Sequence, residues 1–227
     1  MIESPFSLFA SLPRPPRICL LTKADDVKSN ADVARTIGRP VDQLAAVNQV
    51  HGNRVIRVHG PMNGEEEADG LVTDVANLTL KVRMADCQTF VYWAPKHSVI
   101  GALHVGWKGL IAGGVESMFD VLRNEWGIEG SDVWVGAGPS LCMKCADFTD
   151  PMRELPGIPS RFFDGLLVDL CGYGDFLLQE GGVPASQRQR HPGCTRCDPG
   201  AFWTYRGGHR DEVRAGHTNA LTIEIPL

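Results

Sequence analysis

Two histidines and a cysteine, far apart along the chain, belong to the residue types that bind transition metals. His51, Cys87 and His104 each end or follow an apolar segment and lie beside a glycine or a tight corner. Two imidazoles and a thiolate form a borderline-soft donor set that suits Zn²⁺, and three protein ligands leave the fourth position open, as in catalytic zinc sites. The same residues would also fit turn and core histidines and an inert buried thiol, so their spacing alone leaves both interpretations open.

Four further cysteines form two CxxC pairs, Cys142 with Cys145 and Cys194 with Cys197. One CxxC pair is weak evidence for zinc or for a redox couple. Two such pairs can together make a Cys₄ zinc site, but the sequence does not show that they meet. The predicted metal site therefore includes only His51, Cys87 and His104.

Short apolar segments predict a chain in which strands outnumber helices. Strands are expected at 17–22, 44–50, 54–58, 78–87, 89–94, 99–107, 133–141 and 220–225. The segments 44–50 and 54–58 are expected to pair around a turn at His51-Gly52-Asn53. The acidic stretch 63–70 is interpreted as a solvated loop. Helices are expected at 110–127 and 166–182.

This order of elements does not alternate as βαβ units would, which favours an α+β fold with mixed sheets and helices packed in layers. The length of 227 residues suits one domain, expected to span 1–227 with residues 1–16 as a proline-rich lead-in. The composition, 43% hydrophobic and 22% charged, can support a core.

Charge and hydropathy limit the kinds of partner that the chain is expected to bind. The net charge of −5 and the lack of a basic cluster argue against nucleic-acid binding. No apolar run is long enough to span a membrane, and the first residues lack the pattern of a secretory signal. Together with seven cysteines, an odd number, these features predict a protein of the reducing cytoplasm without a membrane partner.

Six motifs occur in one order and carry a resemblance to a known family. They are NQVHG (48–52), ADGLVT (68–73), ADC (85–87), ALHVGWKG (102–109), GAGPSL (136–141) and CTRCDPGAFWTYR (194–206). Together they resemble the YfiH or laccase-domain family, also called the multicopper polyphenol oxidase family, whose members are understood as purine nucleoside phosphorylases. The resemblance covers roughly residues 40–225.

The resemblance implies a YfiH-like fold and a metal, usually zinc, held by His51, Cys87 and His104. It also implies a reaction with phosphate that cleaves the N-glycosidic bond of adenosine, inosine, guanosine or 5′-methylthioadenosine. Adenosine deamination at the same site is a further family activity. The implied partners are a purine nucleoside and phosphate, while the sequence identifies no protein partner.

Several positions depart from the family pattern while the three metal-binding positions match it. These positions are Thr89, Lys108, Asp147, Gly174, Leu177, Gly207 and His217. The departures put the choice of substrate in question more than metal binding.

Residues near the motifs are candidates for catalysis and substrate binding. Arg206 and Lys108 suit phosphate, since arginine binds oxyanions bidentately and lysine as a point charge. For deamination, an acid must move protons, and Asp86 and Asp147 are the candidates.

Two of these roles have ordinary structural alternatives. Trp107 and Tyr205 could stack on a purine, although such aromatics often simply pack the core. Asp86 could instead cap a turn or support the neighbouring ligand Cys87.

Three other functions stay open. A copper polyphenol oxidase would need more histidines than the seven present, although copper remains the alternative to zinc. A cysteine hydrolase would use Cys87 as nucleophile and His104 or His51 as base. A non-catalytic binding protein would explain the departures from the family pattern.

Overall fold

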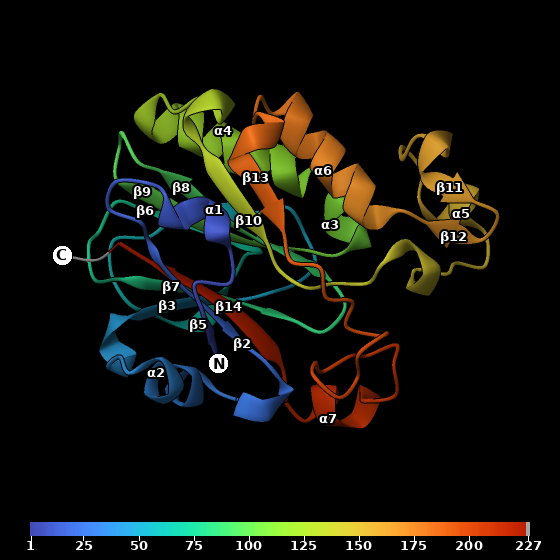
Figure 1. The fold of residues 1–227 in the computed structure, drawn as a ribbon, viewed down its shortest axis with the longest axis horizontal. Coiled ribbons are helices and arrows are strands. Elements are labelled where there is room, and N and C mark those ends of the chain that lie inside the picture. The colour runs from blue at the N-terminus through green and yellow to red at the C-terminus, as the bar shows by residue number, and fades with distance from the viewer. Residues whose placement is uncertain (226–227) are drawn as a thin grey trace.

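Two six-stranded sheets pack face to face in the computed structural model, which describes residues 1–225 (Figure 1). Helices α3, α4 and α6 cover the outer face of one sheet, and α2 lies against the other. Between the sheets, apolar side chains from both layers form one continuous core that includes Leu80, Leu221, Val91, Trp93 and Ile100. The expected mixed α+β layer architecture is confirmed.

The first sheet holds the amino-terminal strand at one edge and the carboxyl-terminal strand in its interior. Its order is β1 (Ile2–Glu3), β2 (Arg17–Leu21), β14 (Asn219–Glu224), β7 (Thr79–Met84), β3 (Leu44–Asn48) and β5 (Met62–Glu67). Strands β1, β2, β14 and β7 pair antiparallel, whereas β3 runs parallel to both β7 and β5.

The second sheet carries the longest buried strands. Its order is β13 (Arg188–Arg190), β10 (Trp134–Ala137), β8 (Gln88–Ala94), β9 (Val99–Val105), β6 (Gly70–Thr73) and β4 (Val55–Arg57). Every residue of β8 and β9 is buried, as expected for strands covered on both faces. A separate hairpin pairs β11 (Phe163–Asp164) with β12 (Leu167–Val168).

Seven α-helices complete the described part of the chain. They are α1 (Ser7–Ala10), α2 (Asn30–Ile37), α3 (Trp107–Ile111), α4 (Gly114–Trp126), α5 (Pro151–Glu154), α6 (Leu170–Glu180) and α7 (Arg210–Arg214). Short 3₁₀ turns occur at 23–25, 41–43, 130–132, 143–145, 160–162 and 185–187. Within residues 1–225, none of the helices combines the length and apolar character needed to cross a membrane.

The helix expected at 110–127 is in fact two helices, because Gly113 adopts a left-handed φ of +83° between α3 and α4. Helix α4 buries Val115, Met118, Phe119 and Leu122 at helical spacing and ends at Gly127, which is also left-handed. The other expected helix begins later than predicted, at Leu170, because Asp169 caps it and β12 precedes it.

The predicted pairing of 44–50 with 54–58 is wrong. Strand β3 belongs to the first sheet and β4 to the second, so the chain crosses between the layers at His51–Asn53. A later crossing, at 85–87, joins β7 of the first sheet to β8 of the second. Both crossings open at the same end of the sandwich, and this brings distant residues together.

The acidic stretch 63–70, interpreted as a solvated loop, and the proline-rich lead-in 1–16 both contain regular elements. The acidic stretch contains β5, an edge strand with mostly exposed side chains, so it carries no hydrophobic signal. The segment 1–16 contains β1 and α1, and it buries Phe6 and Phe9 in the core between the sheets.

Candidate functional site

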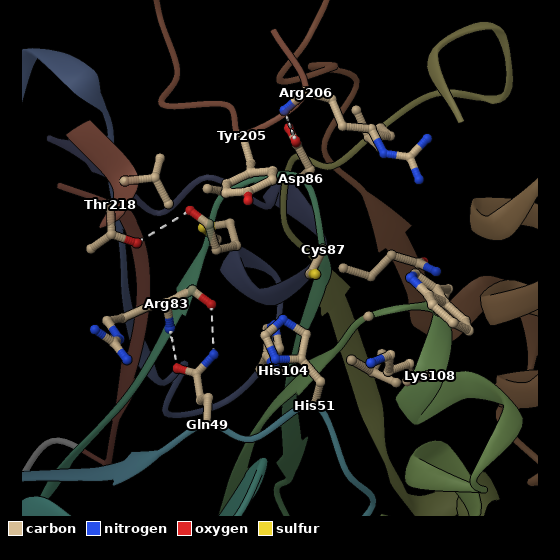
Figure 2. Close-up of a pocket in the computed structure, with 18 of the residues that line it drawn as sticks. Gln49, His51, Arg83, Asp86, Cys87, His104, Lys108, Tyr205, Arg206 and Thr218 are labelled. Atoms are coloured by element: carbon tan, nitrogen blue, oxygen red, sulfur yellow. Dashed lines mark hydrogen bonds between the residues drawn. The ribbon is translucent and has the colours of Figure 1, made fainter. Parts of the chain in front are cut away.

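The structure brings His51, Cys87 and His104 together at one end of the sandwich (Figure 2). Their nitrogen and sulfur ligand atoms all lie within 4.8 Å of one another. His51 comes from the β3–β4 crossing, Cys87 from the β7–β8 crossing, and His104 from the end of β9. The two imidazole rings meet edge to face, with centroids 4.8 Å apart. One ion of Zn²⁺ size can be reached by all three side chains.

Gly106 makes this close approach possible. A Cβ atom at this position would lie 2.9 Å from Cys87 Sγ and 3.2 Å from His51 Cδ2. The first distance is shorter than non-bonded carbon and sulfur atoms tolerate, so a side chain here would push the ligands apart. The glycine two residues after His104 therefore belongs to the site.

Asp69, just before β6, holds both histidines. Its fully buried carboxylate accepts hydrogen bonds from the backbone N–H of His51 at 3.0 Å and of Gly52 at 2.6 Å. These bonds fix His51 in a left-handed conformation, φ +61°, which is unfavourable for a non-glycine residue. The same carboxylate lies 2.9 Å from His104 Nδ1, which leaves Nε2 free to bind an ion.

The negative charge of Cys87 and the positive charge of His104 stabilise each other. Burial raises the pKa of the Cys87 thiol, but hydrogen bonds and positive charge from His104 and His51 outweigh burial and hold that pKa at about 6. Burial lowers the pKa of His104, but Asp69 and Cys87 raise it to about 9. Cys87 is thus a thiolate at neutral pH, which is the form that binds metals or acts as a nucleophile.

Asp86 also faces the space between these side chains, but both of its carboxylate oxygens already accept hydrogen bonds. Its carboxylate accepts hydrogen bonds from Thr195 Oγ1 at 2.7 Å, Thr204 Oγ1 at 2.6 Å and the backbone N–H of Arg206 at 2.7 Å. Its φ of +90° is also left-handed. Three donors fix the position of this carboxylate, so the geometry favours a positioning role next to Cys87 over proton transfer.

A cavity of about 630 Å³ opens above the two histidines and the cysteine. This volume lies within the range of small-molecule sites. Four residues that the sequence suggested for substrate binding line it, namely Trp107, Lys108, Tyr205 and Arg206. Figure 2 shows Tyr205 and Asp86 on one side of the cavity and Lys108 with the histidines on the other.

Arg206 and Asp147 are paired with each other at the rim. The Arg206 guanidinium donates to the backbone carbonyl of Asp147 at 2.6 Å and lies 3.7 Å from its carboxylate. Arg196 forms a closer ion pair with that carboxylate, at 2.6 Å, and holds its pKa below the usual range. Asp147 does not line the cavity, so the structure separates it from the other candidate catalytic residues.

Several residues that the site uses had no role predicted from the sequence. Asp69 lies within the ADGLVT motif and Gln49 within NQVHG, so both were in quoted motifs without a function. Gln49 forms two hydrogen bonds with the backbone of Arg83, at 2.8 and 2.9 Å (Figure 2). Arg83 lines the cavity, and within residues 1–225 its guanidinium has no hydrogen-bond or ion-pair partner. No local pattern marks a lone arginine on a strand.

The chain matches the family model described as multi-copper polyphenol oxidoreductase laccase over residues 22–223. It is 32% identical over 193 residues to a Streptomyces griseus protein named purine nucleoside phosphorylase, covering 81% of this chain and 77% of that protein. It is 25% identical over 211 residues to the Bacillus subtilis purine nucleoside phosphorylase YlmD, covering 85% and 75%.

The fold has close counterparts among solved structures. The crystal structure of YlmD from Geobacillus stearothermophilus superposes with a TM-score of 0.79 at 21% identity, covering 98% of this chain and 94% of that one. The Bacillus licheniformis protein YfiH superposes with a TM-score of 0.73 at 24% identity, covering 87% and 79%. These likenesses establish the fold that the sequence motifs indicated.

Proposed function

Because the chain belongs to the multi-copper polyphenol oxidoreductase laccase family, we propose that the cavity above His51, Cys87 and His104 is the active site of a zinc-dependent purine nucleoside phosphorylase. Relatives that match most of the chain carry the name purine nucleoside phosphorylase. The observation that carries the proposal is that metal-binding and cationic side chains line one cavity of nucleoside size.

The donor set fits zinc. Two imidazoles and a thiolate are ligands that Zn²⁺ prefers, and Asp69 orients one imidazole as carboxylates do in zinc sites. When bound, zinc would act as a Lewis acid in the cavity. His51, Cys87 and His104 would hold it, and Gly106 would leave room for their approach.

The reaction joins a phosphate oxygen to C1′ of the ribose as the bond from C1′ to the purine nitrogen breaks. The bonding electron pair leaves with the purine, which then takes up a proton. Positioned cations accelerate such a reaction by orienting the phosphate and balancing its charge. Arg83 and Lys108 are the candidates, because the guanidinium of Arg206 already contacts Asp147.

The aromatic side chains at the opening suit a purine ring. Tyr205 lines the cavity and accepts a hydrogen bond from Arg214 at 3.3 Å. Trp107 packs edge to face on Phe148, with ring centroids 6.2 Å apart. A planar base could stack on either ring. The family's nucleosides, namely adenosine, inosine, guanosine and 5′-methylthioadenosine, are the proposed substrates.

The test is to incubate the pure, zinc-loaded protein with inosine, adenosine and 5′-methylthioadenosine, with and without phosphate. We expect the free base and the matching sugar 1-phosphate only when phosphate is present: ribose 1-phosphate from inosine and adenosine, and 5-methylthioribose 1-phosphate from 5′-methylthioadenosine. Inosine formed from adenosine without phosphate would indicate deamination instead. If metal-loaded protein turns over none of these nucleosides, the proposal is wrong.

A cysteine hydrolase is the second candidate, because Cys87, His104 and Asp69 lie in series. Asp69 contacts Nδ1 of His104, and the Cys87 thiol has a pKa of about 6. This order of thiolate, imidazole and carboxylate also occurs in nucleophilic enzymes. Metal analysis distinguishes the two functions: a Cys87→Ala variant that retains full zinc would disprove the metal site and favour a free nucleophile. The same analysis would detect copper.

A further inference from the structure

The four cysteines of the two CxxC pairs meet in the structure, and none of them lines the cavity. Cys142 and Cys145 follow β10, and Cys194 and Cys197 follow β13. Their sulfur atoms all lie within 4.8 Å of one another. Cys197 Sγ is 3.8 Å from Cys142 Sγ and 3.4 Å from Cys145 Sγ. The sequence suggested such a group but could not place the two pairs together.

These distances resemble those of a tetrahedral zinc–thiolate site. With Zn–S bonds of about 2.3 Å, the sulfur atoms of a tetrahedral site are about 3.8 Å apart. All seven cysteines are free thiols in the structure. Cys197 is close to two other sulfur atoms at once, an arrangement that suits a shared ion better than one disulfide.

The surrounding groups also suit thiolates. The backbone N–H of Cys142 donates to Cys194 Sγ at 3.3 Å, and such bonds stabilise sulfur in its charged form. Arg196 lies between Cys194 and Cys197 in sequence and donates to the backbone carbonyl of Cys145 at 3.0 Å. Its guanidinium, which also pairs with Asp147, therefore lies beside the backbone of Cys145.

We propose that Cys142, Cys145, Cys194 and Cys197 bind a second zinc ion, which has a structural role. All four coordination positions would be filled by protein, which is the mark of structural rather than catalytic zinc. Zinc binding would release the thiol protons to solvent as the four thiolates form. This site is separate from the cavity, so the inference does not rest on the proposed phosphorylase activity.

The second ion would hold two loops that carry the cavity wall. Thr195, between the paired cysteines, donates to Asp86, the neighbour of Cys87. Ser140 and Cys194 form a β-bridge, and Leu141 lines the cavity. Loss of the ion would therefore free the residues that fix Asp86, while leaving His51, Cys87 and His104 in place.

The test compares zinc content and stability of variants purified under reducing conditions. The double variant Cys142→Ser/Cys197→Ser changes one half-buried and one exposed thiol and keeps the buried Cys145, which limits damage to packing. Cys171→Ser is the matched control, because its partly buried thiol lies outside the four-cysteine group. Cys87→Ala removes the cavity site and leaves the second site intact.

We expect two zinc ions per chain in the parent protein and in Cys171→Ser, and one in Cys87→Ala and in the double variant. The double variant should unfold on the order of 5–10 °C lower than the parent, as expected for the loss of a few stabilising interactions in a domain of this size. Cobalt-loaded Cys87→Ala should retain the intense sulfur-to-cobalt absorption of a tetrahedral thiolate site.

Two results would overturn the inference. One is a parent protein whose zinc content is one per chain and does not change in the double variant. The other is a pair of disulfides among these cysteines in freshly isolated protein, detected as four cysteines that take up an alkylating reagent only after reduction. If the double variant does not fold, the cobalt spectrum of Cys87→Ala decides the question.

Discussion

The carboxylate of Asp69 and the imidazole of His104 form a buried pair, with Oδ1 2.9 Å from Nδ1. The other oxygen of Asp69 accepts from the backbone of Gly52, beside His51. One fully buried acid thus orients two of the three proposed metal ligands. Its pKa stays below the usual range because hydrogen bonds from His104 and the backbone outweigh the effect of burial.

Replacing Asp69 by Asn should weaken zinc binding in the cavity by about 10- to 100-fold, because the charge that orients His104 is lost. Competition with a chromophoric chelator would measure this affinity. Asp74→Asn is the control, since Asp74 pairs with Arg57 at the surface. Equal zinc affinity in parent and Asp69→Asn proteins would refute the orienting role.

Replacing Gly106 by Ala should reduce both zinc affinity and turnover by at least about 10-fold, because the added methyl group would lie 2.9 Å from Cys87 Sγ. Zinc titration and steady-state kinetics would detect the change. Gly60→Ala is the control, because a Cβ there meets nothing within 4 Å. If Gly106→Ala binds zinc as the parent does, the ligands tolerate more separation than this geometry indicates.

Replacing Arg83 by Gln should raise the KM for phosphate by about 10- to 100-fold, because a charged contact to an oxyanion contributes about 1.5–3 kcal/mol. Zinc content should not change, since Arg83 is not a ligand. Arg54→Gln removes a surface arginine that pairs with Glu66 and should leave KM unaltered. If the KM for phosphate is unchanged in Arg83→Gln, Arg83 does not bind phosphate and Lys108 becomes the candidate.

Glu224 links global stability to pH. Its carboxylate forms two hydrogen bonds with Arg39, both 2.8 Å, and accepts from Thr79 at 2.7 Å. Burial raises its pKa, but these partners outweigh burial and lower it. The unfolded chain therefore binds the proton more readily, so this stabilisation is complete above the ordinary glutamate pKa of about 4.3 and is lost as pH falls through the folded value.

Glu224→Gln should lower the free energy of unfolding by about 1–3 kcal/mol at pH 7, with allowance for the partial exposure of Arg39. Its stability should also fall less steeply than that of the parent below pH ~4. Urea unfolding at several pH values would measure both. Glu3→Gln, a largely exposed partner of Arg17, is expected to match the parent.

The sequence predicts well those elements whose burial is regular. The buried strands at 89–94 and 99–107 and the helical spacing around Met118 all correspond to observed elements. The strand β5 escaped prediction because its side chains face solvent, and its backbone is ordered by pairing with β3. Whether two successive strands pair or join different sheets depends on tertiary packing, and a local sequence pattern does not report it.

The candidate site is likewise only partly predictable from the sequence. Residue types and family motifs point to His51, Cys87 and His104, but the partners of Asp86 lie more than 100 positions away in sequence. Gly207 illustrates a departure with a structural reason. A Cβ there would lie 2.4 Å from Thr204 Cγ2, and Thr204 is one of the donors to Asp86.

Two of the segments where the chain crosses between the sheets, 51–53 and 85–87, each carry one proposed ligand. Before the layers dock, an incoming ion would meet only isolated imidazoles and thiols during synthesis. Binding of the proposed metal in the cavity would therefore be a late step of maturation, after the sandwich has closed. The rate at which a coloured ion such as cobalt enters the cavity site would then report when the two sheets dock. A chelator added to the folded protein would remove the ion that joins the two crossings.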